Sequence, residues 1–159
     1  MGPVETHALR LLRMWSWSDV HRETIRLAAP IQFGAAHGVC VVRAFEGLFE
    51  ALEVAARPKL TTNPPDTSWL TPDEIWFARL AGATTHAPGA ALACVAERIG
   101  PEECAAVAEK AEGLTGLLEL CLKARGKAGA AACPIGRPSA CPLQPQPERA
   151  EKPHLVLVK

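Results

Sequence analysis

The chain has 159 residues, equal numbers of acidic and basic side chains, and a hydrophobic fraction of 48%, enough for one domain with a core. Zero formal charge argues against a protein that binds nucleic acid through a general attraction to phosphates. The chain has no run of eighteen apolar residues and no N-terminal secretory pattern, so we expect no membrane span. We therefore expect a cytoplasmic protein whose six cysteines stay reduced.

A first helix is expected over about His7–Met14, where apolar residues recur at helical spacing. Two tryptophans, Trp15 and Trp17, follow at the boundary before the next helix. Tryptophan is enriched at the energetic centres of protein interfaces, so we interpret Trp15 and Trp17 as anchors for a protein partner. The alternative is that these rings fill or cover the core.

A second helix is predicted over about Asp19–Ala29, with Ser18 as its N-cap and Pro30 as its end. Its residues at three- and four-residue steps are expected to share one face. This expected face consists of Val20, Thr24, Leu27 and Ile31.

The third helix, predicted over about Val39–Ala56, has the most regular pattern in the chain. Glutamates occupy one side and an apolar stripe the other, which is typical of a helix packed on a core. We interpret the glutamates as a solvated face rather than as paired catalytic carboxylates. The stripe consists of Val42, Phe45, Phe49, Leu52 and Ala56, widened by Val41, Leu48 and Ala55.

Residues 58–69 contain several helix-breaking residues and are predicted to form a loop. The strongest local signal in the chain follows this loop. Thr71 and Glu74 can each accept a hydrogen bond from the other's backbone amide, a capping box, and Pro72 suits the first helical position. These residues predict the start of a fourth helix that extends to about Ala81.

Two further helices are predicted over about Pro88–Ile99 and Pro101–Arg125, with Gly126 as the final cap. From Lys127 onward prolines recur and the helical pattern is lost, which predicts a disordered tail. The tail ends in the apolar run Leu155–Val158, which could add to another protein's sheet edge or could simply be a frayed end. The expected organisation is a helical domain of residues 1–126 and a tail of residues 127–159.

No group of residues in the sequence predicts an enzyme, a metal site or a cofactor. Nucleophile motifs, phosphate-binding glycine loops and dinucleotide fingerprints are absent. His37 and Cys40 are three residues apart, but a zinc site needs a second pair of ligands. A thiol-redox or metal-binding protein stays open as an alternative, because Cys133 and Cys141 would be accessible in a flexible tail.

A second alternative is a DNA-binding regulator, because residues 75–99 can be aligned with a helix-turn-helix motif that has Gly82 in its turn. Residues 87–96 would form the recognition helix, yet they include no Arg, Lys, Asn or Gln to contact base edges. We therefore do not expect nucleic acid as the partner.

The pattern as a whole predicts an all-α fold, a compact bundle of five to six short helices with a disordered Pro-rich C-terminal tail. The function that we prefer is a small non-enzymatic interaction or regulatory module that binds a protein partner through an apolar groove. A homo-oligomer is also compatible with the sequence.

Overall fold

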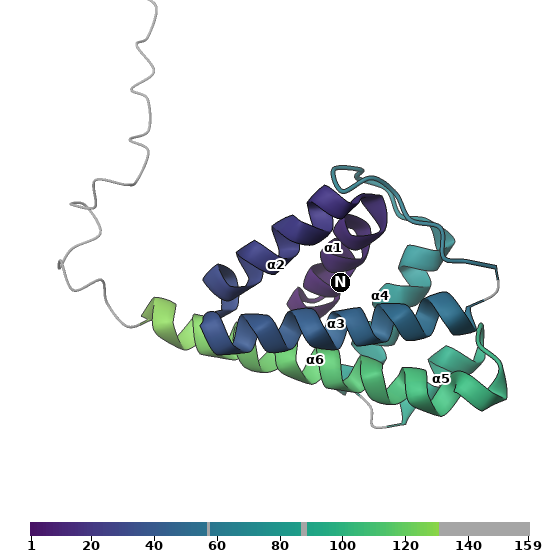
Figure 1. The fold of residues 1–159 in the computed structure, drawn as a ribbon. Helices are drawn as coiled ribbons and strands as arrows, with labels where there is room; N and C mark the ends of the chain where they lie inside the picture. Colours follow the sequence, from purple (N-terminus) through teal and green to yellow (C-terminus); the bar gives the residue numbers. More distant parts are fainter. Residues whose placement is uncertain (57, 87–88, 131–159) are drawn as a thin grey trace, which may run out of the picture.

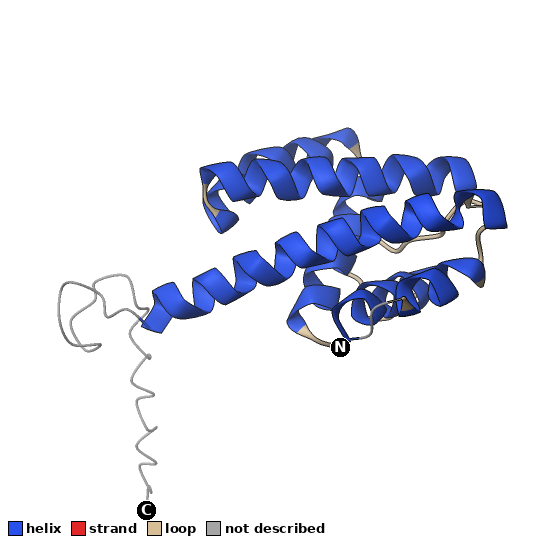
Figure 2. Ribbon diagram, turned by 90° about the horizontal axis from the view of Figure 1, so that it is seen from below, coloured by secondary structure: helices blue, strands red, loops and turns tan. Residues whose placement is uncertain are grey.

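The computed structural model describes residues 1–56, 58–86 and 89–130, and these residues form six α-helices (Figure 1). All of the described secondary structure is helical, so the predicted all-α bundle is confirmed (Figure 2). The helices are α1 (Pro3–Trp17), α2 (Asp19–Phe33), α3 (Ala35–Ala55), α4 (Pro72–His86), α5 (Ala90–Ala96) and α6 (Pro101–Ala130).

The two longest helices, α3 and α6, lie side by side, and α6 contacts each of the other five (Figures 1 and 2). The helix pair α1–α2 packs at one side of α3 and α6, and α4 contacts both α1 and α6. Within the described residues, no helix is both long and apolar enough to cross a bilayer.

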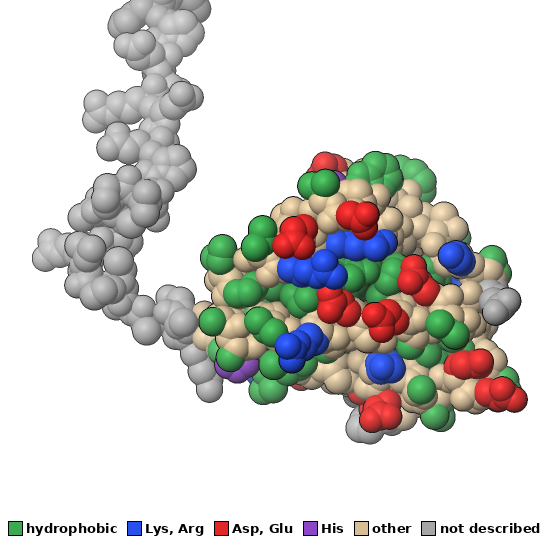
Figure 3. Space-filling view, in the orientation of Figure 1, with side chains coloured by type: hydrophobic (Ala, Val, Ile, Leu, Met, Phe, Trp, Pro, Cys, Tyr) green, Lys and Arg blue, Asp and Glu red, His purple; other side chains and the backbone are tan. Residues whose placement is uncertain are grey.

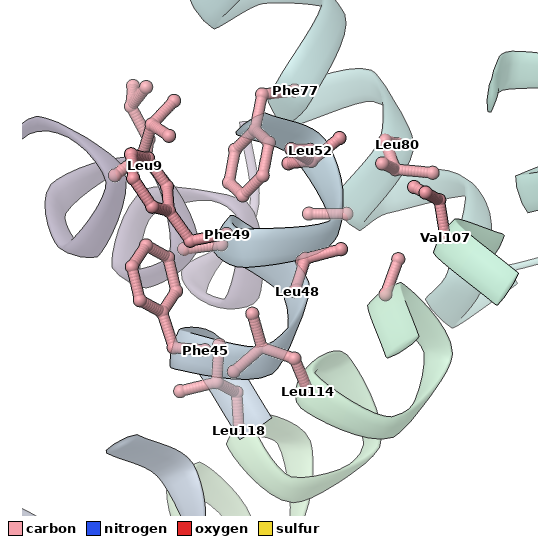
Figure 4. Close-up of a cluster of buried hydrophobic side chains, with 14 of the residues drawn as sticks. Leu9, Phe45, Leu48, Phe49, Leu52, Phe77, Leu80, Val107, Leu114 and Leu118 are labelled. Carbon is pink, nitrogen blue, oxygen red and sulfur yellow. The ribbon is translucent and has the colours of Figure 1, made fainter. Parts of the chain in front are cut away.

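The predicted core face of the third helix is confirmed. Phe45, Leu48 and Leu52 are each about 1% exposed, and Phe49 is 9% exposed. Burial of each such side chain stabilises the fold by roughly 1.5–3 kcal/mol. Figure 4 shows these side chains clustered with residues of α1, α4 and α6, namely Leu9, Phe77, Leu80, Val107, Leu114 and Leu118.

The expectation that Pro30 ends the second helix is wrong, because α2 continues to Phe33. A proline inside a helix removes one backbone hydrogen bond and bends the helix, but it does not have to end it. The chain turns instead at Gly34, whose φ of 86° is a left-handed conformation that glycine adopts without strain.

The last helix is also longer than predicted, since α6 passes Gly126 and ends at Ala130. Residues 127–130, assigned to the tail in the sequence, therefore belong to a helix. The rest of the predicted tail, residues 131–159, lies outside the described residues. The fifth helix is shorter than expected and covers Ala90–Ala96.

The face that the sequence predicts for the second helix lies outside the core. The buried residues of α2 are Ile25, Ala29 and Phe33, while the expected face points to solvent. The α2 helix carries apolar side chains on two sides, so periodicity alone could not decide between them. The packing of α3 against Ala29 places the Ala29 side of α2 in the core, so the opposite side of α2 faces solvent.

Gly38 allows this close packing between α2 and α3. A Cβ atom at Gly38 would lie 2.4 Å from the carbonyl carbon and oxygen of Ala29 and from the nitrogen of Pro30. Real Cβ atoms do not approach backbone atoms this closely, so any side chain at residue 38 would push the two helices apart.

We predict that Gly38→Ala lowers the free energy of unfolding by about 1–3 kcal/mol, measured by urea denaturation. Gly113→Ala is the matched control, because no atom lies within 4 Å of a Cβ at that position in α6. Alanine favours helix over glycine, so the control should gain about 0.5–1 kcal/mol. If the two variants changed stability equally, the close packing at Gly38 would be disproved.

Candidate functional site

The outward side of α2 presents a row of apolar residues that we call the α2 stripe: Val20, Leu27 and Ile31. Their exposed fractions are 75%, 66% and 87%. Single exposed apolar residues are ordinary, but three on one helix face, at seven- and four-residue steps, form an exposed apolar row. A helix that is apolar on two sides is suited to lie between two packing partners.

A groove between α1 and α2 runs beside this stripe. Leu11 and Met14, both half-buried, come from α1, and Thr24 and Ala28 come from α2. Thr24 and Ala28 are helical neighbours of the stripe residues, so the groove and the stripe form one surface. The remaining groove residues are His7, Arg10, Ile25, Ala29, Gln32 and Phe33.

The two tryptophans interpreted as partner anchors lie in different environments. Trp15 is 6% exposed, and its ring meets those of Phe45 and Phe49 edge-on at centroid distances of 5.6 and 6.3 Å. Trp17 is 52% exposed. The structure therefore places Trp15 in the core and leaves Trp17 available at the surface; partner binding by either residue stays a prediction.

Trp17 does not line the groove but lies on the same side of α1 as two residues that do. It follows Met14 by three residues and Arg10 by seven, so the three side chains share one side of α1. The sequence pointed to Trp17, but it did not indicate the groove between α1 and α2. A second apolar row in α2, formed by Ile25, Ala29 and Phe33, was the signal that this helix has two apolar sides.

Arg10 supplies the positive charge in the groove. It is exposed, lines the groove, and forms no ion pair with another described residue. On the other side of α2 the charges are paired, since Arg26 binds Glu46 of α3 at 2.8 Å. Figure 3 shows acidic and basic side chains interspersed over the region of α2 and α3. The groove thus combines mostly apolar side chains with one cation that has no ion-pair partner among the described residues.

A buried ion pair holds α1, the groove's first wall, against α4. Arg13 Nε donates to Glu74 Oε1 at 2.8 Å, and Arg13 Nη2 donates to Oε2 at 2.9 Å. The side chains are 8% and 0% exposed. This two-point geometry is the strongest form of an arginine–carboxylate contact. Sequence reasoning missed it, because nothing local connects residues 61 positions apart.

The predicted capping box at the start of α4 is confirmed. The amide of Glu74 donates to Thr71 Oγ1 at 3.1 Å, and the amide of Thr71 donates to Glu74 Oε2 at 2.9 Å. The Glu74 carboxylate also accepts from the amide of Asn63 at 2.9 Å. One carboxylate therefore caps α4, pairs with α1 and holds the preceding loop.

The loop of residues 58–71 is fixed by further polar contacts to α1 and α4. Arg13 donates to the carbonyl oxygens of Thr67 and Trp69, the latter at 2.7 Å. Asp73 accepts from the amide of Thr61 at 2.6 Å and pairs with Arg98. These contacts satisfy polar groups of Arg13 and Asp73, whose burial would otherwise be costly.

Two effects act in opposite directions on the pKa of Glu74. Burial alone would raise it, but the hydrogen bonds from Arg13 and from the Thr71 and Asn63 amides outweigh burial and bring the pKa below its ordinary value. The charged form of Glu74 is therefore favoured in the folded protein, which ties the stability of the fold to pH.

The cysteines offer little support for thiol chemistry in the described part of the chain. Cys94, Cys104 and Cys121 are buried, and Cys40 is exposed. Burial raises the pKa of both Cys94 and Cys121, which makes their reactive thiolates scarcer. The other two candidates, Cys133 and Cys141, lie outside the described residues.

The described residues support neither the metal-binding nor the DNA-binding alternative. Among the described side chains, no three of His, Cys, Asp and Glu gather as a metal site requires. The helix that would enter the DNA groove, α5, has seven residues, and Ala91, Cys94 and Val95 are buried. Arg98, the nearby cation, is paired with Asp73.

Comparison of the chain with protein-family models, curated proteins and solved structures found no match. Only the residues of the site itself therefore indicate what it can bind.

We predict that Glu74→Gln lowers the free energy of unfolding by about 3–5 kcal/mol at pH 7, because it leaves the Arg13 charge buried and unpaired. The difference from wild type should shrink as pH falls below about 4.3, the usual pKa of glutamate, since wild-type Glu74 then approaches its own folded-state pKa and loses its charge.

The matched control for this prediction is Glu97→Gln, which breaks the exposed Arg79–Glu97 pair. It should cost less than about 1 kcal/mol. Denaturant unfolding between pH 3 and 7 measures both variants. Equal losses in the two variants would show that the buried pair has no special role.

Proposed function

We propose that this protein is an interaction module that binds an amphipathic helix of another protein in the α1–α2 groove. The observation that carries the proposal is the α2 stripe, whose three apolar side chains are mostly exposed although the opposite side of the same helix already forms core. A groove that borders an apolar helix face is a common way for one protein to hold a helix of another.

The lining of the groove indicates the chemistry of the partner. Apolar side chains at three- and four-residue steps would contact Leu11, Met14 and the stripe, while an acidic residue would pair with Arg10. Methionine adapts its shape to different apolar surfaces, so Met14 suits such contacts. Trp17, exposed at the end of α1, is the residue best suited to become a buried aromatic anchor.

The fixed backbone around the groove favours binding. The ion pair of Arg13 holds α1 in place before any partner arrives, and Gly38 permits the packing that turns the stripe outward. A surface that needs no rearrangement loses less entropy on association. We further propose a cytoplasmic location and a regulatory role; the location is supported by the free cysteines among the described residues.

We predict that Ile31→Asp abolishes partner binding without unfolding the protein. Ile31 is 87% exposed, so the substitution removes no core contact but places a charge in the proposed interface. The full chain would be used to capture proteins from cells of the source organism, and each captured protein would then be purified and titrated against it by calorimetry.

Val54→Asp is the matched control, since Val54 is 70% exposed on α3 and lies outside the groove. A partner lost with Ile31→Asp and kept with Val54→Asp supports the proposal. Partners that bind both variants equally contradict it. Self-association that only Ile31→Asp disrupts would also contradict it, because a second copy would then fill the groove.

A further inference from the structure

We infer that the chain carries its own ligand for the groove: residues Leu155–Val158 dock on the α1–α2 surface and compete with the partner. The inference rests on the proposed function and adds regulation to the same site. Four consecutive apolar residues, Leu155, Val156, Leu157 and Val158, form the last apolar run in the sequence. Their chemistry matches Leu11, Met14 and the α2 stripe.

The fold places the start of the C-terminal segment at a suitable end of the molecule. The last turns of α6 lie at the same end as the turn between α2 and α3, where Ile31 is located (Figures 1 and 2). His7 and Phe33, whose rings lie 6.2 Å apart, form the end of the groove nearest to this turn. The Phe33 end of the groove and the last turns of α6 therefore lie at the same end of the bundle.

The length of the segment is sufficient. Twenty-four residues separate Ala130 from Leu155, and such a chain can span up to about 80 Å. The α2 helix, with fifteen residues, is only about 22 Å long. Because docking would be intramolecular, a short apolar contact benefits from a high effective concentration and needs little intrinsic affinity.

The segment before the apolar run carries charges of both signs, with Glu148 and Glu151 beside Arg149 and Lys152. Glu151 lies four residues before Leu155 and can pair with Arg10, the groove cation that has no ion-pair partner among the described residues. Docking in this way covers the α2 stripe in the absence of a partner, and a partner helix has to displace it.

Methionine methyl NMR of the full chain tests this inference. The chain has two methionines, Met1 and Met14, and only Met14 lines the groove. We expect the Met14 methyl signal to move when Leu155 and Leu157 are both changed to serine, with the Met1 signal unmoved. The Met14 signal of the wild type should not depend on protein concentration, as intramolecular docking requires.

Leu143→Ser is the matched control, because it removes a tail leucine outside the apolar run and should leave the Met14 signal unchanged. An identical Met14 signal in the wild type and in the doubly substituted chain would overturn the inference, as would a concentration-dependent signal. This readout needs no partner. It can therefore fail while Ile31→Asp still abolishes capture, and it can succeed when no partner is found.

Discussion

The buried contact between Arg13 and Glu74 is the interaction on which the rest of this structure depends. It joins the first helix to the fourth, and through Glu74 it also fixes the loop of residues 58–71 between α3 and α4. An isolated buried charge would destabilise the fold, so each of these residues requires the other. The hydrogen bonds to the carboxylate offset the cost of burying this ion pair away from water.

Local signals in the sequence were sufficient for part of the fold. The capping box formed by Thr71 and Glu74 and the core stripe of α3 depend on residues three or four positions apart, and both are confirmed. The partner of Glu74 could not be found in this way, because Arg13 is 61 residues away. Which side of α2 faces the core depends on Gly38, because this residue lets α3 pack closely against Ala29. That contact joins two different helices, so the local sequence of α2 could not reveal it.

The orientation of α2 in the bundle creates the candidate site. Periodicity identified Val20, Leu27 and Ile31 as one apolar face, but tertiary packing chose the opposite face for the core. The exposed residues therefore form an apolar surface that the other described helices leave uncovered. The sequence pointed to two tryptophans together, and burial separates them: Trp15 belongs to the aromatic core, while Trp17 is exposed near the end of α1.

Native-state hydrogen exchange of the Asn63 and Thr71 amides tests the central role of the buried ion pair most directly. Both amides donate to the Glu74 carboxylate, so they report whether this contact opens separately from the rest of the fold. If the pair holds the bundle together, both amides exchange only through global unfolding, as slowly as the amides in the middle of α3. Fast exchange at both positions in an otherwise protected protein would contradict this account.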